Sequence, residues 1–304
     1  MHNRFLSWLF LGAAFALISL RAQSPGTSPI AGGAERVLAA RVAGTVQMTV
    51  NGQTTAVKAD DRVPQTAKII TGKDSSIVLV FSNGATTQLG SDTELIIEEF
   101  LQDPFANTVR VAEMAEEPSR SRTRLALNRG ELVGNVKKLK HAEGSTYTIV
   151  TPVGAAGIRG TTFRIVFRPI AAGQAFGAIP QPVEFSLTTL EGDVRFQQGP
   201  PTGPAGAGAF AGSPEVPVRT GQEIVLNVTV SRNAGGQFSM ANVPRAPSAV
   251  AMGQVTAGQM AQAAQRLISA TTDTAFAPTP SAGAISPPPR IQPAPRTTPL
   301  SGER

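Results

Sequence analysis

Between residues 41 and 230, apolar and polar residues alternate in short runs that Gly, Asn and Asp separate. A period of two places successive side chains on opposite faces of an extended chain, so these runs predict β-strands rather than helices. In the first run Met48 and Val50 share one face, and Asn51-Gly52 follows directly. This dipeptide accepts a positive φ at both central positions of a tight turn, which predicts a β-hairpin.

Further turns are predicted where Gly, Asn and Asp interrupt the alternation, at 82–84, 128–130, 191–193 and 220–221. A glycine-rich bend leads into the strand at 163–167, whose Phe and Ile residues share one face. Strands that are adjacent in sequence usually pair. The expected fold is therefore all-β, an antiparallel β-sandwich or β-roll, with a short β-helix as the alternative.

The C-terminal part of the chain has a different pattern. Thr256 and Gln259 have the spacing of a capping box, and apolar residues then recur at helical spacing, so a helix is expected at about 256–270. The Pro-rich sequence beyond it sustains neither helix nor inner strand. The expected organisation of the whole chain is a signal peptide at 1–22, a flexible linker at 23–40, a β domain at 41–243 with excursions at 101–121 and 197–214, a linker at 244–277 that holds the helix, and a disordered tail at 278–304.

The N-terminal residues predict export. A short positively charged start precedes an uncharged apolar run at 5–20, which is typical of a signal peptide with cleavage near Ala22; an uncleaved anchor is the alternative. No later apolar run approaches membrane length, so no integral membrane span is expected after cleavage. The chain has no Cys, so it is expected to fold without disulfides in the periplasm or at the cell surface.

The net charge is +6, and basic and acidic residues are interspersed along most of the chain. With one Trp and one Tyr, the sequence lacks the concentrated basic face and stacking aromatics of a nucleic-acid-binding protein, and no nucleic-acid partner is expected. The one basic concentration includes Arg122, Arg124 and Arg129. Arg122 and Arg124 are predicted to share a strand face, which either meets an anionic envelope polymer or an acidic envelope protein, or is simply solvated.

No catalytic, metal or cofactor site is predicted. His141 is the only histidine expected after cleavage and the chain has no Cys, so a zinc site would need carboxylates and a nucleophile–base pair would depend on this one residue. It follows several lysines and is expected on a solvated loop. The adjacent pair Glu98 and Glu99 is expected to point to opposite faces of a strand and to form no acid/base site. The glycines at 154–160 lack the following helix of a phosphate loop. Arg159 among them either binds an anionic ligand or hydrogen-bonds carbonyls of a neighbouring strand.

Several segments together resemble a known family. They are Val-Ala-Gly-Thr-Val at 42–46, Ile-Thr-Gly-Lys-Asp-Ser at 70–75, Arg-Gly-Glu-Leu at 129–132 and, as the most specific, Thr-Pro-Val-Gly-Ala-Ala-Gly-Ile-Arg-Gly-Thr-Thr-Phe at 151–163. This combination resembles the FecR domain of bacterial envelopes. The resemblance implies a compact all-β periplasmic domain that binds another component, often a receptor's signalling domain, and relays the signal to a sigma factor.

The start of the chain departs from the ferric-citrate type of FecR regulator, which carries a cytoplasmic segment and a membrane helix before the domain. Direct contact with a sigma factor is therefore not expected. The sequence favours an exported, non-catalytic binding or signal-relay module of the cell envelope. The alternative is a structural envelope scaffold without a specific ligand, whose Pro-rich tail spans space between neighbours.

Overall fold

The computed structural model describes residues 36–171, 179–199, 214–235, 238–241 and 247–278. The predicted signal peptide at 1–22, most of the linker at 23–40 and most of the excursion at 197–214 lie outside these residues, as does the tail beyond 278. The described part is mostly β-structure with a single α-helix near its C-terminal end, which confirms the all-β prediction. Strand β1 begins at Val37, and helix α1 spans Gln254–Thr271.

Fifteen strands form one hydrogen-bonded sheet that is folded into two layers, which we call sheet I and sheet II. Three long strands contribute to both layers: β9 (Ser121–Asn135), β11 (Gly154–Pro169) and β12 (Gln181–Gln198). The remaining strands of sheet I are β2 (Val46–Val50), β3 (Gln53–Ala56), β4 (Lys68–Thr71), β7 (Glu94–Gln102), β10 (Thr146–Thr151) and β13 (Glu215–Arg219). Those of sheet II are β1 (Val37–Ala43), β5 (Ser76–Phe81), β6 (Thr86–Leu89), β14 (Gln222–Arg232), β15 (Phe238–Ala241) and β16 (Val250–Ala251).

Aromatic contacts show that the two layers face each other. Phe185 and Phe196 belong to the same strand, β12, yet their rings stack with centroids 5.1 Å apart. A straight strand would separate residues 11 positions apart by about 36 Å. The strand therefore folds back over itself between them, and the inward side chains of both layers form one large apolar core.

The chain passes between the layers along two creases. At the first crease, β1 leads into β2, β4 into β5 and β6 into β7, and β9 bends at Gly130. At the second, β11 bends at Gly160, β12 bends at Gly192, and β13 leads into β14. In the pairing of β9 with β11, Gly130 lies opposite Phe167 and Asn135 lies opposite Thr162. Gly160 is therefore next to the end of β9, and the two creases lie at opposite ends of the sandwich.

This arrangement dictates the direction of β10. After crossing at the first crease, β9 ends at the opposite end of the sandwich, and the chain re-enters sheet I from there. Strand β10 consequently runs parallel to β9, with Thr146 opposite Arg122 and Val150 opposite Ala126. The other pairings between named strands of the described chain are antiparallel, so the expected antiparallel sheet holds with this one exception.

Three of the predicted turns have a different role from the one expected. The turn at Asn51-Gly52 is confirmed, with φ of 51° and 80° and strands β2 and β3 paired on either side. By contrast, 128–130 and 191–193 are bends inside single long strands. Residues 220–221 separate β13 and β14, which pair with different halves of β12 rather than with each other. A tight turn between two strands and a sharp bend inside one strand can both place a residue at positive φ. A glycine in the sequence is compatible with either, so it does not distinguish them.

Hydroxyl groups join neighbouring chain segments at the first crease. Thr93 accepts a hydrogen bond at Oγ1 from the Glu131 amide at 3.1 Å, and the Gly90 amide donates to the Glu131 carbonyl at 3.0 Å. A Cβ on Gly130 would lie only 2.4 Å from the Thr93 Cα, and Gly130 has φ +101°. Only glycine permits this close backbone approach.

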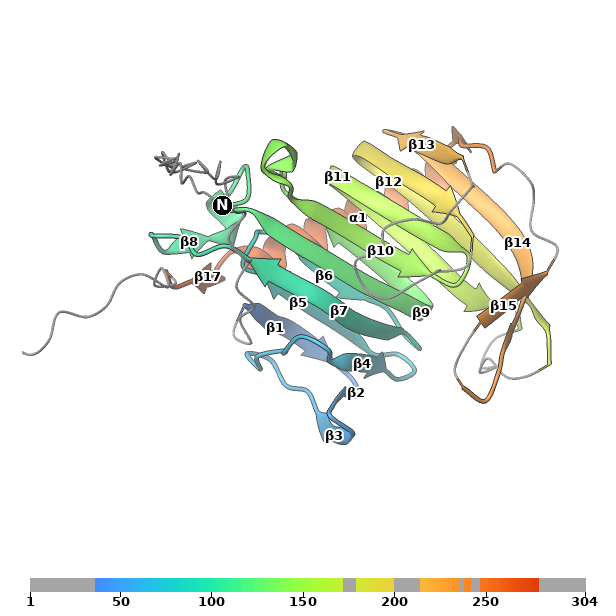
Figure 1. The fold of residues 1–304 in the computed structure, drawn as a ribbon, viewed down its shortest axis with the longest axis horizontal. Helices are drawn as coiled ribbons and strands as arrows, with labels where there is room; N and C mark the ends of the chain where they lie inside the picture. The colour runs from blue at the N-terminus through green and yellow to red at the C-terminus, as the bar shows by residue number, and fades with distance from the viewer. Residues whose placement is uncertain (1–35, 172–178, 200–213, 236–237, 242–246, 279–304) are drawn as a thin grey trace, which may run out of the picture.

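Helix α1 covers the outer face of sheet II, and Figure 1 shows it running behind the strands. Leu267 and Ala270 pack on Val78, Val80 and Val133 in a second apolar cluster. The predicted capping box is wrong, because the helix begins earlier and has Gly253 at its N-cap without a side-chain cap. After the helix, β17 (Ala275–Phe276) pairs with β8 (Val109–Arg110). Earlier in the chain, short 3₁₀ turns occupy Val111–Glu113 and His141–Glu143.

We predict that Gly130→Ala destabilises the fold by about 2–4 kcal/mol, because the new methyl group meets the Thr93 backbone at a positive φ. Gly221→Ala is the matched control: its φ is +73°, but nothing lies within 4 Å of the added Cβ. It should cost only about 1–2 kcal/mol of strain. Urea unfolding of the full chain measures both, and equal losses would show that the close approach at the crease contributes nothing.

A second prediction concerns Tyr147, whose hydroxyl lies 3.2 Å from the Thr87 hydroxyl in the core. Burial raises the pKa of this phenol above its usual value, while the Thr87 hydrogen bond opposes the shift. The unfolded chain therefore loses the phenolic proton first, so stability falls as pH rises above about 10. Tyr147→Phe should flatten this alkaline loss of stability. Because Tyr147 is the only tyrosine, phenolate absorbance should appear together with unfolding; its appearance in the folded protein near pH 10 would contradict the assignment.

Candidate binding surface

The outer face of sheet I carries the predicted arginine pair. Arg122 and Arg124 lie on β9, and their side chains are on the face opposite the buried side chains of Leu125 and Leu127, as the alternation predicted. Each meets a carboxylate of β7: Arg122 Nη2 lies 3.0 Å from Glu99 and Arg124 Nε lies 2.7 Å from Glu98. The charges of both arginines are thus matched within the protein.

The prediction that Glu98 and Glu99 point to opposite faces is wrong. The pairing of β7 with β9 shifts register between Ile97 and Glu99, which is the mark of a β-bulge. The extra residue brings both carboxylates to the same face, where they contact the two arginines of β9. They form ion pairs rather than a shared acid/base site.

Arg159 joins the same face, whereas Arg129 does not. Arg159 lies exposed on β11, between the buried Ile158 and the bend at Gly160. Its side chain makes no hydrogen bond or ion pair with any residue that the structure describes, so the expected bonds to neighbouring carbonyls are not found there. Arg129 lies at the first crease, where its Nε donates to the Asp92 carbonyl at 3.1 Å.

The fold adds two arginines that the sequence analysis did not single out. Asp193 of β12 is directly opposite Arg159 on one side and Arg219 of β13 on the other. Arg195 donates to the Asp193 carboxylate at 2.8 Å, and this hydrogen bond and charge raise the pKa of the guanidinium. The alternating pattern of both strands was visible in the sequence. Their register against β11 depends on pairings between distant segments and was not.

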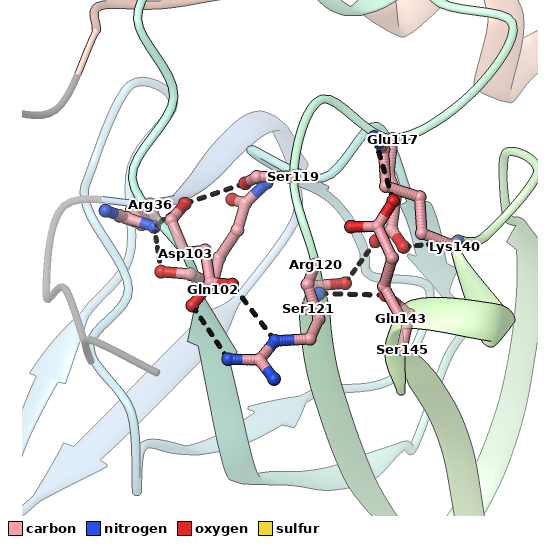
Figure 2. A network of polar contacts seen from close by, with 10 residues as sticks. All are labelled: Arg36, Gln102, Asp103, Glu117, Ser119, Arg120, Ser121, Lys140, Glu143 and Ser145. Atoms are coloured by element: carbon pink, nitrogen blue, oxygen red, sulfur yellow. Dashed lines mark hydrogen bonds and ion pairs between the residues drawn. The ribbon is translucent and has the colours of Figure 1, made fainter. Parts of the chain in front are cut away.

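A polar network closes one end of the sandwich, and Figure 2 shows it at close range. Arg120 makes two hydrogen bonds to the Asp103 carboxylate, at 3.0 and 3.4 Å. Arg36 is almost fully buried and donates to the Gln102 carbonyl at 2.7 Å. Burial lowers the pKa of Arg36, and the nearby charge of Asp103 opposes this shift. These contacts tie the start of β1 to the end of β7 and the start of β9.

Glu117 is the most deeply buried carboxylate of this network, with 2% of its surface exposed. It accepts hydrogen bonds from the Ser121 hydroxyl at 2.5 Å and from the Lys140 amide at 2.6 Å. Ser121 in turn accepts a hydrogen bond from Asn83 and donates its amide to Ser145. Both oxygens of Glu117 are thus bonded within the protein, and the network is structural.

The remaining candidates are isolated from one another. His141 is exposed, and its Nδ1 lies 3.1 Å from the Ser145 carbonyl. Among the described residues, no three His, Asp or Glu side chains gather in a way that could hold a metal ion. No helix among the described residues is long and apolar enough to cross a membrane.

The bent two-layer sheet, with a helix on one outer face and arginines on the other, defines an all-β domain with an open polar surface. Residues 67–195 match the family model described as FecR protein, and the chain therefore contains a FecR domain. The match includes β4 through most of β12, and β1–β3, β13–β17 and α1 lie outside it. The FecR family is generally associated with the bacterial envelope.

The comparison with solved structures finds a weaker likeness. Two crystal structures of a protein described as a "putative anti-sigma factor" from Parabacteroides distasonis ATCC 8503 share 12% sequence identity with this chain, at a TM-score of 0.33. Each match covers 58% of this chain and 59% of that chain, so it spans less than two thirds of either. No curated protein matches the sequence.

We predict that Glu117→Gln destabilises the fold by about 1–3 kcal/mol, because a charged acceptor of two buried hydrogen bonds is replaced by an amide with one oxygen. Glu113→Gln removes an exposed carboxylate whose only partner among the described residues is Arg110, and should change stability by less than about 0.5 kcal/mol. Urea unfolding curves of the two variants test this difference. Equal stability of the two would show that the network does not hold this end of the sandwich together.

Proposed function

We propose that the chain is an exported, non-catalytic FecR module of the cell envelope that binds another envelope component and relays a signal through that contact. The family match at residues 67–195 supports a regulatory rather than a catalytic role. The proposed contact surface is the outer face of sheet I, because helix α1 occupies the outer face of sheet II.

One observation carries the choice of this surface. Arg159 belongs to the segment at 151–163, the most specific part of the family resemblance, and it projects into solvent without a partner in the described structure. A planar guanidinium that makes no internal hydrogen bond is available for a carboxylate or another acceptor of a bound molecule. Arg122 and Arg124 border the same face and contribute to it as internally paired charges.

Site-specific photo-crosslinking in envelope extract tests the proposal. A photoreactive residue replaces Thr146, which is exposed on β10 and lies opposite Arg122 on sheet I. The control position is Asn227, an exposed polar residue on the outer face of sheet II. We expect one saturable adduct from position 146, which the unmodified chain competes away, and no such adduct from position 227.

Two outcomes would contradict the proposal. Adducts of the same identity and yield from both positions would show that sheet I is not the contact surface. The lack of a saturable adduct from either position would favour the structural envelope scaffold without a specific ligand.

A further inference from the structure

The arginines of the described structure are almost all matched to acceptors. Eight form ion pairs with Asp or Glu: Arg110, Arg120, Arg122, Arg124, Arg164, Arg168, Arg195 and Arg232. Four others contact a backbone carbonyl or an aromatic ring: Arg36, Arg41, Arg62 and Arg129. Within the described residues, the side chains of Arg159, Arg219 and Arg266 alone have no such partner.

Two of these three arginines lie in one row of the sheet. Arg159 and Arg219 come from β11 and β13, which are far apart in the sequence, and each is directly opposite Asp193 of the strand between them. Residues opposite each other on adjacent strands point to the same face, so both guanidinium groups and the carboxylate occupy the outer face of sheet I. Two strand spacings separate the arginine backbones, or about 10 Å.

Asp193 does not neutralise the pair, because its carboxylate is engaged by Arg195 at 2.8 Å. Both unpaired arginines are exposed, and the group formed by Arg159, Asp193, Arg195 and Arg219 has three positive charges and one negative charge. It is therefore a local positive site in which two guanidinium groups keep all their donors available.

We propose that Arg159 and Arg219 form a two-point site for an acidic segment of the partner protein, which binds through two carboxylates. This inference rests on the proposed function and specifies the chemistry of the same surface. The spacing of about 10 Å matches carboxylates three residues apart on a segment in the polyproline II conformation, which rises about 3.1 Å per residue and returns to the same side every third residue. Asp193, and Glu215 further along β13, place negative charges on the same face. A uniformly charged polymer would meet repulsion from them, whereas a protein segment with separated acidic residues does not.

The test uses the full chain and two labelled peptides at low ionic strength. One peptide carries two Glu residues three positions apart, and the other has Gln at both positions. Fluorescence anisotropy should show saturable binding of the Glu peptide, with at least about tenfold weaker binding by the Gln peptide. Dextran sulfate, as a competitor, reports whether a simple polyanion occupies the site instead.

The variant Arg159→Glu/Arg219→Glu should lose at least about tenfold in affinity for the Glu peptide. The matched control is Arg168→Glu/Arg266→Glu, which changes the net charge equally but lies on sheet II and helix α1. Its affinity should stay within about twofold of the parent chain, and circular dichroism establishes that both variants are folded. Equal loss in the two variants, equal binding of the two peptides, or binding of dextran sulfate alone would overturn the proposal.

Cross-linking separates this inference from the proposed function. If the adduct from position 146 persists in Arg159→Glu/Arg219→Glu, the surface binds its partner without the acidic site, and only the present inference fails. If no adduct forms in the parent chain but the Glu peptide binds at Arg159 and Arg219, the two-arginine site for acidic segments is supported. The proposal that this surface binds an envelope component then fails.

Discussion

The structure depends on close backbone contact at the two creases of its sheet. Gly130 lies against Thr93, and the hydroxyl of Thr93 hydrogen-bonds the next residue of β9. At the opposite crease, the Gly192 amide donates to the Thr220 hydroxyl at 3.0 Å, and a Cβ on Gly192 would meet the backbone of Gly160. Each pair combines a glycine, which permits the close approach, with a hydroxyl, which satisfies a polar backbone group at the bend. The Glu131 and Gly192 amides at the two bends are therefore hydrogen-bonded where the strands change layers.

The position of the candidate surface follows from these creases. Since β11 and β12 cross at the same end, the row that contains Arg159, Asp193 and Arg219 lies beside that crease on sheet I. The parallel strand β10 then separates this row from Arg122. Side chains from four distant segments meet on one flat face, while α1 covers the opposite face of the sandwich. A rigid sheet thus fixes the distances between the charged groups.

Local signals in the sequence were sufficient for the fold class, the hairpin at Asn51-Gly52 and the helix. These features depend on neighbouring residues, whose periodicity or φ preference is visible in the sequence. Crossings inside β9 and β12 could not be distinguished from hairpins, because Gly130 and Gly192 satisfy either geometry. The position of Arg122 and Arg124 on one face was predicted correctly. Their pairing with Glu98 and Glu99 was not, because it requires a bulge in a strand about 25 residues away.

Strand β9 has strand partners on both edges and in both layers. On one edge it pairs with β7 and β6, and on the other with β10 and β11. During synthesis, the first edge can be completed as soon as β9 emerges, whereas the second waits until residue 167 is available. Until then, the nascent sheet presents an unpaired edge with apolar neighbours, the kind of surface at which strands of other chains add. The strand order that places β9 in the middle of the finished sheet also makes the incomplete chain susceptible to aggregation.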